Sequence, residues 1–210
     1  MKGNIKKLAV FVMIPAIAMF MAVAMASAGN NNSKVTGEYA VTAGMSCLIT
    51  PSGVNDNLTP VNPTAVGSNS ITLQGIATFN RNGTGSMEST GVFIIPPPAR
   101  PPGPNANAFH FSFTFTYDVA DDDTITIDAD ENSFKVTLHT GPLTGKWFTF
   151  DTYSLSGIVS ADQKTLTLGP PTTTINTLTF NTNPPPPLKI ICNGSYVLTR
   201  LGGKSWERSQ

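Results

Sequence analysis

The sequence predicts an all-β protein whose closely spaced antiparallel strands close into a barrel or fold into a sandwich. The clearest evidence is the segment from Ala108 to Asp118, in which aromatic and polar side chains alternate. Successive side chains of a strand point to opposite faces, so this segment has one apolar and one polar face. In addition, no stretch after residue 28 has helical periodicity. Short turns such as Asn82-Gly83 predict hairpins, and a single wide sheet would leave two sticky edges unless it closed.

The first 28 residues have the three parts of a secretory signal peptide. Three lysines within the first seven residues precede an apolar run from Leu8 to Met25, and Ala26-Ser27-Ala28 provides a small-residue cleavage site. The apolar run is also long enough to span a membrane, which leaves a retained anchor as the alternative. Pro15 within the run and the cleavage site favour removal after Ala28, so we expect no stable membrane anchoring of the mature protein.

The rest of the chain is predicted to be one β-barrel domain, residues 29–201, followed by a flexible tail, residues 202–210. Three basic residues and no acidic residue lie in the signal peptide, so 10 basic and 13 acidic residues remain, a net charge of −3. A weakly acidic chain of this kind argues against nucleic acid or an anionic membrane surface as a partner.

Strand and turn patterns divide the domain into about eight to ten strands. Residues 44–70 are expected to form a loop, because Pro51, Pro60 and Pro63 interrupt them. Residues 96–104 and 184–187 are proline-rich, and we expect stiff connectors there rather than docking sites. The predicted strands are residues 35–43, 71–80, 84–95, 108–118, 124–128, 134–139, 146–159, 164–168, 174–180 and 188–201.

Cys47 and Cys192 are the only cysteines. An even pair in an exported chain predicts a disulfide, which would tie the first strand region to the last. A metal site would need further soft ligands, and a catalytic thiol would need a histidine partner.

Gly37-Glu38-Tyr39 near the start and Arg200 near the end resemble the lipocalin-like (calycin) pattern. That family begins with Gly-x-Trp and has a basic residue near its end. Here Tyr39 stands in place of the tryptophan, and no helix precedes the last strand. The resemblance implies an eight-stranded up-and-down barrel in which Arg200 lies across the ring of Tyr39 and closes one end. More broadly, the chain resembles small exported bacterial β-barrel proteins of unassigned function, and the resemblance implies an apolar cup for a small molecule.

The five aromatic residues of the alternating segment are the predicted ligand-binding residues. Their shared parity turns all five rings to one face, which we expect to point into the barrel. The alternative is a barrel filled by its own side chains. These residues are Phe109, Phe111, Phe113, Phe115 and Tyr117.

Residues that could carry out chemistry are sparse in the sequence. His110 and His139 lie in separate strands without a paired ligand, and no Gly-x-Ser-x-Gly hydrolase elbow is present. Seven acidic residues within residues 118–131 could supply oxygen ligands for Ca²⁺, but their spacing does not match an EF-hand, and hydrated turns explain them better. We therefore expect no cofactor and no metal.

The expected function is that of an exported non-enzymatic barrel, secreted or periplasmic, which binds a small apolar ligand or acts as an interaction module. One alternative is a small outer-membrane barrel, with the aromatic face toward lipid. Another is a barrel-type isomerase or cyclase, for which Glu38 or His110 could supply the polar group inside the cup. A third is a component of a surface assembly. The sequence leaves the oligomeric state open.

Overall fold

The computed structural model describes residues 31–95, 106–141, 143–181 and 188–202. The predicted signal peptide, both proline connectors and residues 203–210 of the predicted tail lie outside these described residues. The described chain contains eleven strands and two short 3₁₀ helices, η1 (Asn32–Val35) and η2 (Pro63–Ala65). The strands are β1 (Gly37–Thr50), β2 (Gly67–Phe79), β3 (Thr84–Ile94), β4 (Ala106–Val119), β5 (Thr124–Ala129), β6 (Lys135–Leu138), β7 (Trp147–Phe150), β8 (Ser154–Val159), β9 (Thr165–Gly169), β10 (Ile175–Phe180) and β11 (Leu188–Arg200).

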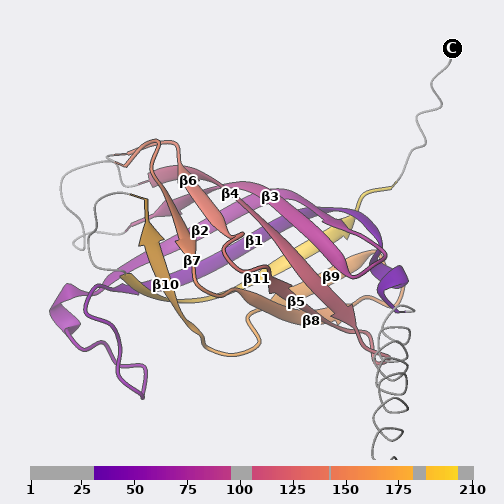
Figure 1. Ribbon diagram of the computed structural model, residues 1–210, viewed down its shortest axis with the longest axis horizontal. Coiled ribbons are helices and arrows are strands. Elements are labelled where there is room, and N and C mark those ends of the chain that lie inside the picture. Colours follow the sequence, from indigo (N-terminus) through magenta and orange to yellow (C-terminus); the bar gives the residue numbers. More distant parts are fainter. Residues whose placement is uncertain (1–30, 96–105, 142, 182–187, 203–210) are drawn as a thin grey trace, which may run out of the picture.

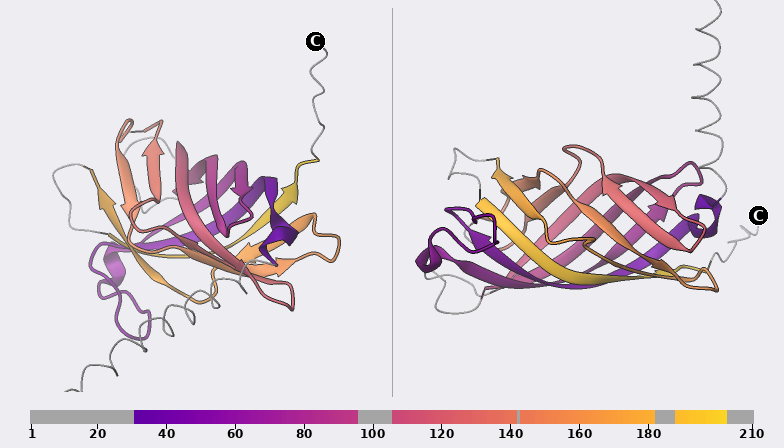
Figure 2. Two further views of the ribbon diagram at one scale, coloured as in Figure 1. Left: turned by 45° about the vertical axis from the view of Figure 1, so that its right-hand side comes forward. Right: turned by 90° about the horizontal axis from the view of Figure 1, so that it is seen from below.

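All eleven strands belong to one antiparallel sheet that closes into a barrel, because β1 pairs with β11 along almost its whole length. The strands follow eight paths up and down the barrel. Five paths are the long strands β1, β2, β3, β4 and β11. The remaining three are each interrupted once, and consist of β5 and β6, β7 and β8, and β9 and β10. The predicted all-β up-and-down barrel is thus confirmed, and Figure 2 shows its strongly tilted strands from the side.

The three interrupted paths lie side by side, so the barrel has two stacked halves that share the five long strands. At one end, β5, β8 and β9 complete a ring of eight strands; at the other end, β6, β7 and β10 do so. In Figure 1 these two sets lie toward opposite ends of the molecule, with η1 beside the first set.

Turn-forming residues explain each interruption. Residues 130–133 form a turn in which Asn132 has a φ of 62°. The Asp151 carboxylate accepts hydrogen bonds from the backbone N–H groups of Thr152 and Thr177, at 3.0 and 2.8 Å. These bonds stabilise a backbone conformation at residues 151 and 152 that is not a strand. Pro170-Pro171 removes two backbone donors from the third path.

Inward side chains fill one half of the barrel. The half that contains β5, β8 and β9 is packed by residues that are almost fully buried. Edge-to-face ring contacts connect Tyr39, Phe79 and Phe115, with ring centroids 5.2–5.3 Å apart. The largest of these buried residues are Tyr39, Phe79, Met87, Phe115, Ile125, Ile127, Leu155, Leu166, Leu168 and Leu198. We call this the filled half.

Two inward-facing glycines make room for the aromatic rings of β4. Gly85 is paired with Phe115, and Gly91 with Phe109. A Cβ atom at Gly85 would lie 2.3 Å from Cζ of Phe115, and one at Gly91 would lie 2.6 Å from Cζ of Phe109. The rings therefore lie over backbone positions that have no side chain.

Several predicted element boundaries were wrong. The expected loop of residues 44–70 is much shorter, because β1 continues to Thr50 and β2 begins at Gly67. The single strand predicted for residues 146–159 is two strands, β7 and β8, separated at Asp151. The predicted strands at residues 124–128 and 134–139 correspond to β5 and β6, which are successive parts of one path because both pair antiparallel with β4. β11 is continuous through Asn193-Gly194.

Candidate functional site

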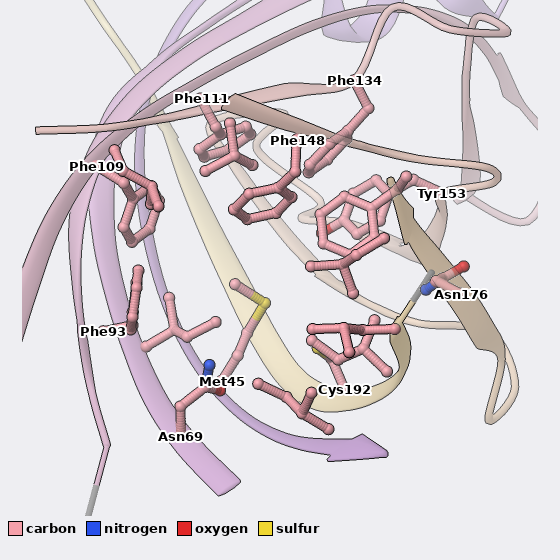
Figure 3. A pocket seen from close by; sticks show the side chains of 18 of the residues that line it. Met45, Asn69, Phe93, Phe109, Phe111, Phe134, Phe148, Tyr153, Asn176 and Cys192 are labelled. Atoms are coloured by element: carbon pink, nitrogen blue, oxygen red, sulfur yellow. The ribbon is translucent and has the colours of Figure 1, made fainter. Parts of the chain in front are cut away.

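The second half of the barrel, completed by β6, β7 and β10, contains a cavity of about 240 Å³. We call this the hollow half. Its wall is built by inward residues of the long strands together with those of β6, β7 and β10. Figure 3 shows aromatic and aliphatic side chains surrounding the cavity, with Phe93 and Phe109 on one side and Phe134, Phe148 and Tyr153 around it. The sequence leaves open whether the barrel is hollow or filled, and the structure has one half of each kind.

The five predicted ligand-binding aromatics all point inward but lie in both halves. Each is at most 5% exposed. Phe109 and Phe111 line the cavity, whereas Phe115 and Tyr117 pack in the filled half. Phe113 lies between them and stacks on Phe111, with ring centroids 5.9 Å apart.

Sequence reasoning missed most of the cavity wall. Phe134 stacks on Phe111 at 5.5 Å and contacts Phe150 edge to face at 4.7 Å. Tyr153 lies in the interruption between β7 and β8, within residues predicted to form one continuous strand. Asn69 falls in the predicted loop, although it is an inward residue of β2. Correct strand bounds would have identified Asn69 by its parity, whereas Phe134 and Tyr153 lie just outside strands and have no such signal.

The cavity wall carries no charge. Among its described lining residues there is no Asp, Glu, Lys, Arg or His, and the polar groups are the amides of Asn69 and Asn176 and the hydroxyls of Tyr153 and Tyr196. A charged ligand would lose its hydration without gaining an opposite charge, which is costly. The cavity therefore suits an uncharged molecule.

Three residues form a hydrogen-bonded cluster at the interruption of the strands. The hydroxyl groups of Tyr153 and Tyr196 are hydrogen-bonded to each other, and the Tyr196 hydroxyl lies 3.2 Å from Sδ of Met45. Burial raises the pKa of Tyr196 to about 12 and that of Tyr153 well above its ordinary value. Both phenols are therefore neutral near pH 7 and act as hydrogen-bonding groups.

The filled half is closed at its end by the pair that the resemblance implied. The Arg200 guanidinium lies over the Tyr39 ring, 5.7 Å from its centroid, and also donates a hydrogen bond to the carbonyl oxygen of Thr36. η1 packs beside this pair, where the Asn32 side chain accepts a hydrogen bond of 3.0 Å from the backbone N–H of Val119.

The predicted disulfide is present between Cys47 and Cys192. The two residues are directly opposed partners on β1 and β11, so the bridge crosses the line at which the first and last strands close the barrel. Cys192 also lines the cavity. A disulfide fits an oxidising compartment.

The remaining candidate groups lie on the outside. His110 is an outward residue of β4, Glu38 an exposed residue of β1, and His139 is exposed beyond β6. None of them reaches the cavity, so the structure contradicts the possibility that Glu38 or His110 supplies a polar group inside the cup.

The acidic residues of the segment 118–131 make local turn and surface contacts. Asp123 forms an ion pair with Lys34 at 2.7 Å, Asp121 accepts from Asn31 at 2.7 Å, and the Asp122 carboxylate accepts from the Thr124 N–H at 3.0 Å. The described residues contain no group of three or more His, Cys, Asp or Glu side chains arranged to hold a metal ion.

Comparison with protein-family models, with curated proteins and with solved structures finds no match to this chain. Within the described residues, no helix has the length and apolar character needed to span a membrane.

Proposed function

We propose that this protein is an exported, non-enzymatic barrel that binds a small apolar molecule in its hollow half. The observation that carries the proposal is the cavity of about 240 Å³, with its almost entirely apolar and aromatic wall. Binding sites for small molecules are characteristically concave and apolar, with a few placed polar groups. An engineered cavity of about 150 Å³ in another protein binds benzene, so the volume here suits a ligand of roughly ten non-hydrogen atoms.

An oxidising location, secreted or periplasmic, is part of the proposal. It is supported by the Cys47–Cys192 disulfide and by the signal peptide that the sequence predicts. A lipocalin-like origin of the barrel is supported by Gly37, Tyr39 and Arg200, which meet at the closed end in the manner that the resemblance implies.

The outward face of the barrel argues against a lipid-embedded barrel. One row of cross-strand partners runs over six strands on the outer surface, and most of its members are hydroxyl, amide or imidazole side chains. Lipid would leave these groups without hydrogen-bonding water. The row consists of Thr42, Gln74, Thr90, His110, Thr137 and Trp147.

An enzymatic role and a role in a surface assembly both find less support than ligand binding. The described residues of the cavity wall offer amides and neutral phenols but no carboxylate or imidazole as a general base, which an isomerase or cyclase of the common type would need. Strand donation to a surface assembly needs a free edge, and β1 and β11 pair with each other instead.

Toluene binding, measured by isothermal titration calorimetry, tests the proposal. The wild-type protein should bind toluene with a negative heat-capacity change. Val136→Trp, which adds an indole to the cavity wall, should abolish binding. Thr137→Trp is the matched control, because the neighbouring side chain points outward and the cavity stays open. Absence of toluene binding to the wild type, or equal binding to both variants, would show that the cavity is not a ligand site.

A further inference from the structure

Asn69 is a buried polar side chain whose acceptor has no partner. The residue is 8% exposed, lines the cavity, and its Oδ1 atom forms no hydrogen bond within the described part of the chain. A buried amide that is left unsatisfied is destabilising, and such groups are rare in native structures. The position calls for an explanation beyond folding.

The second unsatisfied buried atom in the described residues, Oγ of Ser89, has a packing explanation. Ser89 is paired with Gly75, and a Cβ atom at Gly75 would lie 2.1 Å from this oxygen. The small hydroxymethyl group fits a tight contact between β2 and β3, and it does not line the cavity. Asn69 has no such explanation: the residue lines the cavity, although Oδ1 itself is covered by its neighbours.

The surroundings of Asn69 define what could satisfy it. It lies on β2 opposite Cys47, two residues after the strand begins, whereas Asn176 lies on β10 across the cavity, as Figure 3 shows. The Oδ1 atom of Asn176 already accepts a hydrogen bond of 3.0 Å from the Thr152 hydroxyl. Of the two amides in the wall, Asn69 is therefore the one whose oxygen accepts no hydrogen bond.

We infer that the ligand is an uncharged, mainly apolar molecule with one hydroxyl or N–H group, which donates a hydrogen bond to Oδ1 of Asn69 when the amide turns about χ2 and brings this oxygen to the cavity. This inference rests on the proposed function and adds the chemical class of the ligand. The apolar wall receives the hydrocarbon part, and a wall whose described residues carry no charge disfavours a carboxylate or an ammonium group. A site with a buried group meant for hydrogen bonding discriminates strongly against ligands that cannot satisfy it.

Three probes test the apolar part, the hydrogen-bond donor and the charge of the ligand separately. They are toluene, n-octanol and octanoate, each titrated calorimetrically into the full mature chain. The wild-type protein should bind n-octanol at least tenfold more tightly than octanoate, because octanoate brings a charge that the wall cannot pair. Asn69→Leu should weaken n-octanol binding about three- to tenfold, the equivalent of one net hydrogen bond, and change toluene binding by less than about twofold.

Melting temperature and n-octanol affinity, measured together, give a combination that a purely structural role of Asn69 would not produce. Asn69→Leu removes an unsatisfied amide, so the ligand-free variant should melt at a higher temperature than the wild type while binding n-octanol less well. Ser89→Ala is the matched control: it removes the second unsatisfied buried atom and should leave all three affinities unchanged.

Failure of the proposed function and failure of the role of Asn69 give different results. If toluene and n-octanol both fail to bind, the proposed function itself is wrong, and the inference falls with it. If toluene binds but n-octanol and octanoate bind equally, or if Asn69→Leu binds n-octanol as tightly as the wild type does, the cavity is a ligand site and the role of Asn69 is refuted.

Discussion

Arg200 and Tyr39 show how single residues from opposite ends of the chain close the filled half. Gly37 begins β1 with a φ of 131°, a conformation that glycine adopts and other residues rarely do. A Cβ atom there would make only an ordinary contact with the guanidinium, 3.7 Å from Nε, so the backbone conformation is what requires glycine. The Tyr39 ring is fully buried beneath the cation. The charge is thus held against a ring face and the carbonyl oxygen of Thr36.

Removing this cation should destabilise the protein in a way that depends on the ring. A cation–π contact contributes about 0.5–2 kcal/mol, so Arg200→Ala should lower the free energy of unfolding by about that amount. Chemical denaturation of Arg200→Ala, Tyr39→Leu and the double variant gives the coupling between the two side chains. Purely additive losses would mean that the ring contact contributes nothing. Lys in place of Arg200 should recover only part of the loss, because it lacks the planar guanidinium.

The Tyr153–Tyr196 pair should make stability sensitive to alkaline pH. Burial raises the pKa of Tyr196 from 10.0 to about 12 in the folded protein, so the folded state keeps a proton that the unfolded state releases. The resulting contribution to stability is fully present below pH 10 and is lost as the pH rises from about 10 through about 12. It amounts to about 2–3 kcal/mol, at 1.36 kcal/mol per unit of pKa difference.

Denaturation curves measured at successive pH values check this. The double variant Tyr153→Phe and Tyr196→Phe should lose less stability between pH 10 and pH 12 than the wild type, because neither phenylalanine titrates. An identical alkaline loss in the two proteins would contradict the assignment.

Some individual residues of the site could be predicted from the sequence and others could not. Phe109 and Phe111 were identified because the alternation of β4 is visible locally, and the Cys47–Cys192 disulfide because its chemistry is. Phe115 and Tyr117 were predicted on the same alternation but lie in the filled half. Asn69 was not identified, because three prolines downstream of Cys47 made its segment look like a loop. Its role depends on the absence of a hydrogen-bond partner, which only packing in three dimensions reveals.

At the scale of elements, alternation predicted strand faces well and strand ends poorly. The inward parity of β4 is as expected, since each of its aromatic rings is buried. The interruption at Asp151 was missed, because the surrounding residues Phe148, Phe150 and Tyr153 all have high strand propensity. The break results from hydrogen bonds between the Asp151 carboxylate and Thr177, a residue distant in sequence.

The inward glycines of β3 should be sensitive to the smallest side chain. Gly85→Ala would place a methyl group 2.3 Å from the Phe115 ring and 2.5 Å from the carbonyl oxygen of Thr78, so the sheet or the ring must shift. Overpacking of this kind costs about 1–3 kcal/mol. The melting temperature of the variant should fall accordingly.

Gly44→Ala is the matched control for this substitution. Gly44 is also within a long strand, β1, but it points outward, and no heavy atom lies within 4 Å of the position its Cβ would take. Alanine there should be neutral or slightly stabilising, since glycine inside a strand is unfavourable. Equal destabilisation by both substitutions would show that ring packing does not decide the effect.

For the whole molecule, closure of the sheet was predictable but the division into two halves was not. Closely spaced antiparallel strands favour a closed sheet, and a disulfide between the first and last strand regions requires these two to lie side by side. β1 pairs with β11, as expected. Whether a barrel is filled depends on how side chains from eight paths meet at each level. The sequence of any one strand does not contain that information.

The two halves should differ in local stability, and hydrogen exchange measures this directly. Inward residues of β5, β8 and β9 are almost fully buried, with Ile125, Leu155 and Leu166 at 0–2% exposure, whereas Phe148 and Phe150 of β7 face the cavity and are only partly buried. Fewer packing contacts lower the cost of local opening. Backbone amides of β6, β7 and β10 should therefore exchange on the order of tenfold faster than those of β5, β8 and β9.

Saturating toluene should slow exchange in β6, β7 and β10 and leave exchange in β5, β8 and β9 unchanged, because a ligand stabilises the conformation that binds it. Uniform exchange rates, or protection by toluene that is confined to the filled half, would contradict a barrel with one hollow and one filled end.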